Sequence, residues 1–591
     1  MCGVAAIFSY GRAAGPVDAA ELAAIHGAMR ARGPDDEGIW LSTDRKVALA
    51  HRRLAIIDLS PGGHQPMMSE GGAHVLTYNG EIYNFRALRH QLEQEGRRFR
   101  TQSDTEVLLH LYARDGIEMV RHLRGMYAFA LWDARKGGML LARDPLGIKP
   151  LYYADDGATL RMASQVKALR AGGRAGARPS AAGHVGFFLW GHVPEPFTLH
   201  HDIRALPAGA TMWIDANGAA PPRRFWRVRD TLATASPRPL ENGELRDLLA
   251  DSVKHHFVAD TPVGLFLSAG LDSTTLASFA SEEHGADLRT VTLGFDVHDG
   301  SAFDEAPAAE HLARALGARH ETRRVTRTDF IHARGALFAA MDQPTIDGIN
   351  TYFVARAAKE AGLQVALSRL GGDEIFGGYA SFRQIPRAAA LFAPIRRAPG
   401  LGRAFRYIAA PLLRHATSPK YAGLLEYGGS YGGAYLLRRG LFMPWELPDL
   451  LDGEMVREGW RELAPLSALE GTLNGLSTPR QKVAALETCW YMRNQLLRDA
   501  DWAGMAHSVE IRVPFVDSAL LEGLAPSLAS ARPPTKSDMA AAAPRPLPAE
   551  ILTRPKSGFV VPVRDWLSRE SGPPGERGLR SWARRVYEAA A

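Results

Sequence analysis

Val263-Gly264-Leu265-Phe266-Leu267-Ser268-Ala269-Gly270-Leu271-Asp272-Ser273-Thr274 is the stretch that indicates the fold of the second half of the chain. Its first residues are apolar without interruption, which is typical of a buried parallel strand. Small residues then lead into an apolar, Ala-rich segment of helical character that ends near Ala280. Such a strand, turn and helix start directs backbone N–H groups and the positive end of the helix dipole at one point. That point suits a phosphate or pyrophosphate.

The side chains of this turn suit the same ligand. Ser268 and Ser273 add hydroxyl donors, and Asp272 is placed to hold the Mg²⁺ ion that accompanies phosphates. An ordinary turn in an α/β sheet is the alternative interpretation. The sequence motif Ser-x-Gly-Leu-Asp-Ser resembles the pyrophosphate loop of ATP pyrophosphatases, which adenylate a substrate and release pyrophosphate. The ATP-binding residues implied here are Phe266, Ser268, Gly270, Asp272 and Ser273.

One residue of the turn departs from that family. Ala269 stands where the family usually has Gly. Because Ala tolerates positive φ poorly, we expect either a slightly displaced loop or a negative φ at this position.

Length and composition narrow the class of protein. A chain of 591 residues is too long for a single core, so at least two domains are expected. Its 46% hydrophobic and 23% charged residues are those of a soluble globular protein. The net charge of +6 is small for this length and the Lys and Arg residues are scattered. This pattern favours anionic small substrates and gives little support to a nucleic-acid partner.

The cysteines and the N-terminal residues indicate the compartment. Cys2 and Cys489 are the two cysteines, and their separation excludes a disulfide framework or a CxxC metal site. A reducing cytoplasm is therefore expected. The apolar run from Val4 to Phe8 is too short for a signal peptide, and no apolar span is long enough to cross a bilayer. We expect a cytoplasmic protein without a membrane partner.

Cys2 becomes the first residue if the initiator Met1 is removed. Its α-amine, with a pKa near 8, would then be a base beside its own thiol, so one residue would supply both nucleophile and proton acceptor. The alternative is a small buried hydrophobic residue at the start of a strand.

Four polar clusters follow Cys2, each beside an apolar segment; they lie at 32–38, 51–58, 78–84 and 103–106. In this order they resemble the glutaminase domain of class II glutamine amidotransferases, an N-terminal-nucleophile hydrolase with two facing sheets between helix layers. The resemblance implies that Cys2 attacks the glutamine amide and that Asn79 with the Gly80 backbone N–H forms the oxyanion hole. It also implies that Arg53 binds the glutamine carboxylate, while Glu81 and Asp104 receive its ammonium group.

These roles fit the chemistry of amide hydrolysis. A thiolate must attack the carbonyl, donors must stabilise the tetrahedral oxyanion, and other groups must recognise the charged ends of a free amino acid. A bidentate Arg is the natural partner of a carboxylate.

Two further stretches extend the nucleotide site. The apolar run at 288–295 predicts a strand beside the first one in a parallel sheet, and the resemblance places the backbone near Leu293 against adenine. Residues 364–379 repeat the pattern of a strand followed by a small, acidic loop, and they resemble asparagine synthetases. There, the aspartate matching Asp373 holds Mg²⁺ together with the one matching Asp272. The remaining ATP residues implied are Ser368, Arg369 and Lys536.

Lys536 has an alternative interpretation as a solvated surface lysine. Glu510, Arg512 and Asp517 are expected to form a structural ion-pair network.

The loop after residue 367 also departs from the family. Glutamine-hydrolysing asparagine synthetases commonly have Ser-Gly-Glu-Gly where this chain has Ser368-Arg369-Leu370-Gly371. Arg369 adds a cation near the phosphates, but Leu370 can do no acid–base work. This leaves the acceptor carboxylate open.

The resemblance covers the chain from Cys2 to about Leu567. It implies an αββα glutaminase domain at 2–228 and a doubly wound, parallel-sheet ATP-pyrophosphatase domain at 240–570. We expect 171–239 to be a terminal hairpin and linker, and the Arg-rich tail within 571–591 to be solvated or disordered. Many relatives are dimers, so a homodimer is an open expectation.

The function implied is ATP-dependent adenylation of a carboxylate, with L-aspartate first, and amidation by ammonia from glutamine. Three alternatives stay open. One is the same chemistry on a sugar uronate or natural-product carboxylate. Another is a β-lactam synthetase-like ring closure, which would not need Cys2. The last is a catalytically silent nucleotide-binding regulatory protein.

Overall fold

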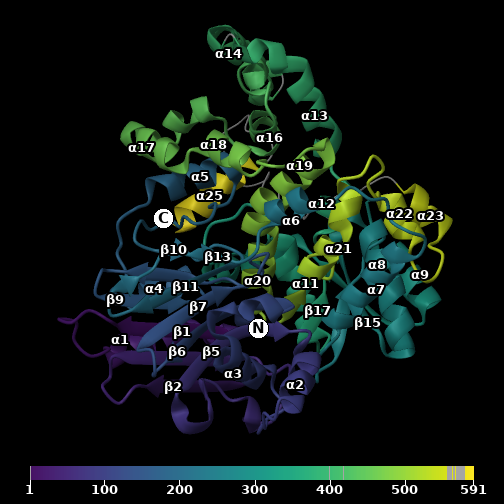
Figure 1. Cartoon of the computed structure of the whole chain (residues 1–591). Helices are drawn as coiled ribbons and strands as arrows, with labels where there is room; N and C mark the ends of the chain where they lie inside the picture. Colours follow the sequence, from purple (N-terminus) through teal and green to yellow (C-terminus); the bar gives the residue numbers. More distant parts are fainter. Residues whose placement is uncertain are drawn as a thin grey trace.

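The computed structural model describes residues 2–301, 303–397, 399–416, 418–554, 562, 566 and 579–590. The chain forms an N-terminal unit of two antiparallel sheets and a C-terminal unit built on a parallel sheet (Figure 1). The first sheet has the order β10-β8-β9-β1-β3-β2, with β1 Gly3–Ser9, β2 Asp36–Leu41, β3 Val47–Arg53, β8 Tyr152–Asp155, β9 Thr159–Ala163 and β10 Arg204–Ala205. The second has the order β12-β11-β7-β6-β5-β4, with β4 Met67–Met68, β5 His74–Ile82, β6 Gly125–Asp133, β7 Gly138–Arg143, β11 Ala210–Asp215 and β12 Gly218–Ala219; β13 Arg223–Arg224 also pairs with β11.

Alternating side chains of β1 explain why two sheets face each other. Val4, Ala6 and Phe8 pack in the core between the sheets. Ala5 and Ile7 point the other way, against α1 Ala19–Ala28 and α4 Val166–Ala171. On the far side of the second sheet lie α2 Phe85–Gln94 and α3 Asp104–Asp115. The predicted αββα sandwich is therefore confirmed.

The parallel sheet has the order β16-β15-β14-β17-β18, with β14 Val263–Phe266, β15 Arg289–Phe295, β16 Arg319–Val325, β17 Val365–Leu367 and β18 Glu510–Arg512. Side chains on the two faces of this sheet pack in separate cores. On one face, Leu265 and Leu367 pack with α7 Glu244–His256, α8 Leu271–His284 and α9 Ala306–Leu316. Val291 and Leu293 pack with α10 Arg327–Ala340 and α11 Ile349–Glu360 on the opposite face. Helices on both faces confirm the predicted doubly wound architecture.

Helices of the C-terminal unit cover and extend this sheet. They include α12 Gly372–Phe376, α13 Ser381–Phe392, α14 Pro399–Ala416, α15 Leu424–Tyr427, α16 Tyr431–Arg439, α17 Gly453–Leu463, α18 Pro465–Gly471, α19 Pro479–Leu486, α20 Arg498–Met505, α21 Ser518–Leu528, α22 Lys536–Ala541 and α23 Ala549–Thr553. Between α19 and α20 the chain continues as a π-helix, Glu487–Leu497. Such wide turns occur often at functional sites.

The stretch expected to be a hairpin and linker contains more structure than that. Residues Ala181–Trp190 form α5, which is buried along its whole length and packs against α17. Gly459 of α17 allows this close packing, because a Cβ there would lie 2.3 Å from the Ala181 carbonyl oxygen. Two glycines of α5 allow the following segment to pack closely as well: a Cβ at Gly183 would lie 2.0 Å from the carbonyl oxygen of Thr198, and one at Gly186 would lie 2.5 Å from Pro194. A composition rich in Gly and Ala therefore marks a tightly packed helix here.

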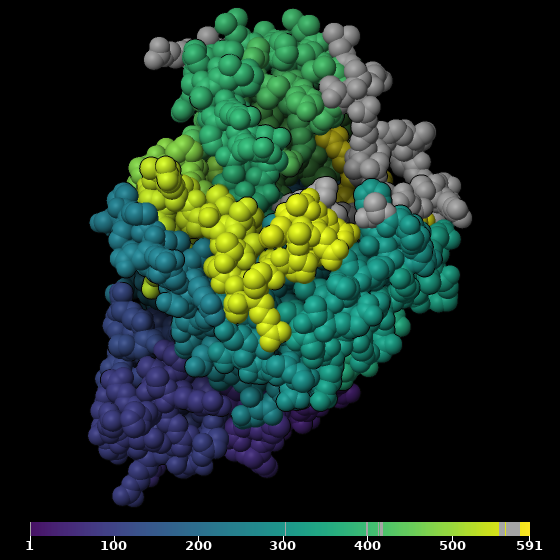
Figure 2. Space-filling model, turned by 90° about the vertical axis from the view of Figure 1, so that its right-hand side faces the viewer, coloured from purple at the N-terminus to yellow at the C-terminus, as the bar shows by residue number. Residues whose placement is uncertain are grey.

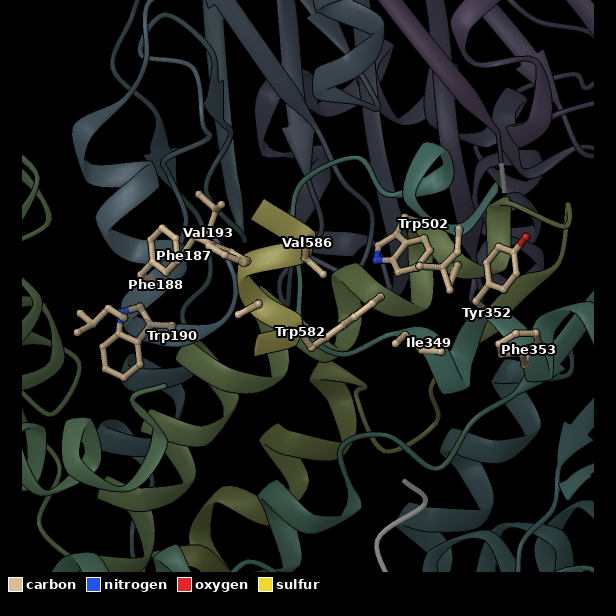
Figure 3. Packing of buried hydrophobic residues seen from close by; sticks show 14 of the residues in the cluster. Phe187, Phe188, Trp190, Val193, Ile349, Tyr352, Phe353, Trp502, Trp582 and Val586 are labelled. Carbon is tan, nitrogen blue, oxygen red and sulfur yellow. The ribbon is translucent and has the colours of Figure 1, made fainter. Parts of the chain in front are cut away.

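The expectation of a solvated or disordered tail is wrong for residues 580–590. They form α25, Arg580–Ala590, whose Trp582, Ala583 and Val586 are buried. Figure 3 shows Trp582 and Val586 between the side chains of α5 and those of α11 and α20. The Arg residues lie on the other side of an amphipathic helix, which a count of charged residues does not reveal. Residues 571–578 lie outside the described residues.

No helix in the described part of the chain combines the length and apolar character needed to cross a bilayer.

Candidate active sites

Cys2 lies directly before β1 and faces the neighbouring sheet. Its backbone N–H donates to the Asn79 Oδ1 atom at 2.8 Å, and the residue is only 8% exposed. Burial raises the pKa of the Cys2 thiol, and the nearby chain terminus partly opposes this shift. A thiol in this position therefore needs a local base before it can attack.

Donors for an oxyanion lie beside Cys2. The Asn79 Nδ2 atom is buried and has no hydrogen-bond partner within the described residues. At the next residue, a Cβ on Gly80 would lie 2.1 Å from the Met126 carbonyl oxygen, so only glycine fits. The arrangement brings together Cys2, Asn79 and Gly80, as the sequence predicts, and leaves one amide donor free for a substrate oxygen.

Arg53 and Asp104 are held rigidly by the backbone. Arg53 ends β3 and donates to the carbonyl oxygens of Ser60 at 3.0 Å and Ile57 at 3.3 Å. The Asp104 Oδ2 atom accepts from the Tyr78 hydroxyl at 2.9 Å and from the Ile82 N–H at 3.0 Å. Burial raises the pKa of Asp104 to about 6. Asp104 is thereby fixed to β5 beside Glu81.

Glu81 belongs to a buried charge network that crosses between the two units. Its Oε2 atom lies 3.5 Å from Arg512 Nη2, and Arg512 Nε donates to Glu510 Oε1 at 2.7 Å. Lys149 Nζ lies 3.7 Å from Glu510 Oε2, with both side chains fully buried. Burial, and then the charge of Glu510, raise the pKa of Glu81. The ion pairs expected at Glu510 and Arg512 thus reach a predicted glutamine-binding residue.

A second buried connection, which the sequence analysis missed, starts at Cys2 itself. Arg32 Nε donates to the Cys2 carbonyl oxygen at 3.0 Å. The same guanidinium forms a bidentate pair with Asp501 of α20 at 2.7 and 2.8 Å. No local pattern relates positions 32 and 501, so only the structure could reveal this pair.

The phosphate loop has the predicted order of strand, turn and helix. The Ser268 and Ser273 hydroxyls lie 2.8 Å apart, and the Gly270 N–H donates to Ser268 Oγ at 3.3 Å. Ala269 is not among the residues with positive φ in the described chain, and Gly270 has a φ of −91°. The loop therefore accommodates Ala269 without backbone strain.

A cavity of about 380 Å³ opens at the carboxyl ends of β14, β15 and β17. Six of the predicted ATP and metal residues line it: Phe266, Ser268, Leu293, Ser368, Arg369 and Asp373. Gly270, Asp272, Ser273 and Lys536 are not among the lining residues. Lys536 nonetheless contacts the cavity wall through Asp373.

Lys536 bridges the two predicted metal ligands. Its Nζ atom lies 3.0 Å from Asp373 Oδ1 and also contacts Asp272 Oδ1. The Lys536 side chain is 16% exposed, which argues against a solvated surface lysine. Space for this cluster depends on glycine, since a Cβ at Gly372 would lie 3.1 Å from both Asp272 and the Lys536 Nζ atom. Two carboxylates from the first turns of α8 and α12 therefore converge on one cation.

Several further polar residues line the cavity without having been assigned a role. Glu374 accepts from the Tyr379 hydroxyl at 2.9 Å, and burial raises its pKa to about 7. Burial also raises the pKa of Asp347. Tyr491 reaches the cavity from the π-helix. The position of Glu374 directly after Asp373 is the sequence signal that could have identified it.

Two family models match the chain. Residues 1–226 match a glutamine amidotransferase domain, and residues 244–586 match asparagine synthase. A Mycobacterium tuberculosis relative is 34% identical over 96% of this chain and 88% of its own. Asparagine synthetase [glutamine-hydrolyzing] 1 of Bacillus subtilis is 31% identical over 100% and 90%. Asparagine synthetase B of Escherichia coli is 35% identical over 61% and 62%.

Fold, sites and relatives together define a C–N ligase that pairs a glutamine amidotransferase unit with a synthetase unit. The chain belongs to the family of glutamine-hydrolysing asparagine synthetases.

Proposed function

We propose that this protein adenylates the side-chain carboxylate of L-aspartate with ATP and amidates it with ammonia from glutamine. The products are asparagine, AMP, pyrophosphate and glutamate. The observation that carries the proposal is the convergence of Asp272, Asp373 and Lys536 beside the cavity. This arrangement provides charges of both signs where a triphosphate and its metal ion would lie.

In the glutaminase unit, the Cys2 thiolate attacks the glutamine amide carbon and forms an acyl-enzyme. The Asn79 Nδ2 atom and the Gly80 N–H hold the oxyanion, and ammonia leaves. Water then releases glutamate. After removal of Met1, the α-amine of Cys2 accepts the thiol proton, and Asn79 Oδ1 orients that amine.

In the synthetase unit, the acceptor carboxylate attacks the α-phosphate of ATP and pyrophosphate departs. Ser268 and Ser273 bind phosphate oxygens, while Lys536 and Arg369 balance the charge of the leaving pyrophosphate. Asp272 and Asp373 fit Mg²⁺, a hard cation that prefers oxygen ligands. Such an ion, when bound, neutralises phosphate charge. The described residues hold no group of three or more His, Cys, Asp or Glu suited to a metal, so ATP oxygens and water would complete the shell.

The two reactions need a protected connection. Free ammonia is mostly protonated at neutral pH and does not attack, so it should pass inside the protein. Arg32, which contacts both Cys2 and Asp501, holds the two units together at the start of such a path. An internal passage predicts little loss of ammonia to solvent during coupled turnover. Ammonia accumulation in step with amide formation would contradict it.

A second candidate keeps this chemistry and replaces aspartate by a larger carboxylate, such as a sugar uronate or natural-product acid. The observation that favours it is the apolar part of the cavity wall, formed by Ile346, Ile349, Val354 and Leu370. Apolar surface of this extent would also suit an acceptor larger than aspartate.

The test is pyrophosphate release with ATP, Mg²⁺ and glutamine, with and without L-aspartate. A Cys2→Ala variant supplied with ammonia is the control. Aspartate-dependent pyrophosphate together with asparagine supports the proposal. Glutaminase activity without aspartate-dependent pyrophosphate supports the larger acceptor, and the absence of glutamine-dependent AMP with every acid tried would leave a regulatory nucleotide-binding protein.

A further inference from the structure

One stretch of the synthetase unit has an extreme charge pattern. Residues 375–425 contain seven arginines and one lysine but no aspartate or glutamate. They include α13, Ser381–Phe392, and α14, Pro399–Ala416. Figure 1 shows these helices at the top of the molecule, with α14 outermost, at the end opposite the glutaminase sheets. Although Lys and Arg residues are scattered along most of the sequence, this stretch concentrates positive charge on the projection that stands at the top of Figure 1 and Figure 2.

The projection also exposes apolar side chains. Leu401, Phe405 and Ile408 follow the i, i+4, i+7 spacing of one helix face and are 65%, 39% and 71% exposed. Nearby, Leu391 is 71% and Tyr407 72% exposed. Of thirteen large hydrophobic residues exposed in the described chain, six lie between positions 391 and 421. Apolar side chains exposed together in this way mark an interaction surface.

Exposed arginines lie on the same two helices and on the segment between them. Arg383 and Arg387 are one turn apart on α13, and Arg396 follows that helix; all three are exposed. On α14, Arg403 is exposed, and its Nε atom lies 3.7 Å from Glu426. We call the residues Arg383, Arg387, Leu391, Arg396, Leu401, Arg403, Phe405, Tyr407 and Ile408 the apical surface.

We propose that the apical surface docks on an anionic lipid bilayer, with the apolar face of α14 inserted among the acyl chains and the arginines against the headgroups. An amphipathic helix with one apolar face and arginines on its polar side lies in the plane of a membrane interface. Arginines close to the lipid surface gain from its negative surface potential. Docking of this kind needs no membrane-spanning helix, and it replaces the sequence-based expectation of a protein without a membrane partner.

The positive charge of the apical surface argues against a second copy of this chain as its binding partner. A symmetric contact through the apical surface would place arginines against arginines, since that surface includes no carboxylate and the adjacent Glu426 is already paired with Arg403 and Arg406. An acidic protein would satisfy the arginines, but its polar surface would leave Leu401 and Ile408 without a partner. A bilayer with anionic headgroups meets both requirements.

The experiment is co-sedimentation of the full chain with vesicles of phosphatidylcholine alone or with about 30% phosphatidylglycerol. We expect at least tenfold more bound protein on the anionic vesicles, and a large decrease at 0.5 M NaCl because salt screens headgroup charge. Failure of the protein to bind anionic vesicles would overturn the proposal.

Two variants separate the contributions of the surface. Leu401→Ser with Ile408→Ser removes the apolar face, and Arg383→Gln with Arg387→Gln and Arg396→Gln removes charge; both act on exposed side chains. Each should reduce vesicle binding at least tenfold while glutaminase activity is unchanged. Ile39→Ser with Leu59→Ser, exposed at 48% and 56% on the glutaminase unit, is the matched control and should bind like the wild type.

Light scattering after size-exclusion chromatography tests whether the apical surface binds a second copy of the chain instead of a membrane. A dimer that the Leu401→Ser, Ile408→Ser variant dissociates would overturn the proposal in favour of self-association. Vesicle binding that neither variant reduces would also overturn it. Equal binding of the chain to an acidic polypeptide such as polyglutamate, abolished by the arginine variant alone, would indicate a protein partner instead.

Discussion

The two candidate sites of this protein differ in how they are held. In the glutaminase site, Cys2 and Asn79 are joined by a direct hydrogen bond, and a glycine without space for a side chain follows. In the synthetase site, the important charges lie around a cavity of about 380 Å³ and meet through a long, flexible lysine. A rigid site suits one fixed substrate, glutamine, whereas an open site can vary its acceptor while keeping its ATP chemistry.

Removal of the nucleophile should give the largest effect and separate the two sites. We expect Cys2→Ala to lower glutamine-dependent amide formation at least about 1000-fold, because no other group on that side can form the acyl-enzyme. Ammonia-dependent pyrophosphate release should persist. Coupled assays with glutamine or ammonium chloride measure both activities, and an equal loss of the two would contradict the independence of the synthetase site.

Asp373→Asn is the corresponding change in the synthetase site. It removes a charge that faces Lys536 and the proposed metal ion, and we expect pyrophosphate release to decrease by about 100-fold or more. Glutaminase activity should change little. The matched control is Asp299→Asn, an exposed acid elsewhere in this unit, which should leave pyrophosphate release unaltered. A synthetase rate that survives Asp373→Asn would exclude this carboxylate from the reaction.

The Arg32–Asp501 pair, which connects the two units, should contribute to the free energy of unfolding. Asp501→Asn leaves the buried Arg32 guanidinium without its counter-charge, which costs about 3–5 kcal/mol of unfolding free energy. The comparison is Glu118→Gln, which breaks exposed pairs with Arg121 and Arg223 and should cost about 1 kcal/mol or less. Urea unfolding of both variants measures the difference. Similar costs would mean that Arg32 and Asp501 do not hold the two units together.

The smallest effect concerns pH. Asp104 has a pKa of about 6, so its carboxylate is present above pH 6 and is protonated below it. A protonated Asp104 cannot bind the glutamine ammonium, and KM for glutamine should rise about tenfold for each unit below pH 6. Asp104→Asn should have a high KM with little pH dependence from pH 5 to 8. A KM of the wild type that is constant over this range would remove Asp104 from substrate binding.

Features formed by neighbouring residues could be predicted from the sequence, whereas contacts between distant residues could not. The strand, turn and helix at 263–274 can be predicted from adjacent residues, and so can the acidic segment that carries Asp373. The Arg32 and Asp501 pair joins residues 469 positions apart, and no short-range pattern encodes it. At α25 the composition gave a wrong prediction, because only the spacing of Trp582 and Val586 indicates that they share one buried face.

Lys536 has a consequence for how the nucleotide is admitted. Two carboxylates brought together without a counterion repel each other, and here an ammonium group of the same chain lies between them. If the site binds Mg²⁺ and ATP as proposed, their arrival would be an exchange of cations in which Lys536 leaves the carboxylates and turns to the phosphates. Because the single positive charge of Lys536 already offsets part of the repulsion between the two carboxylates, their arrangement would be retained at low metal concentration.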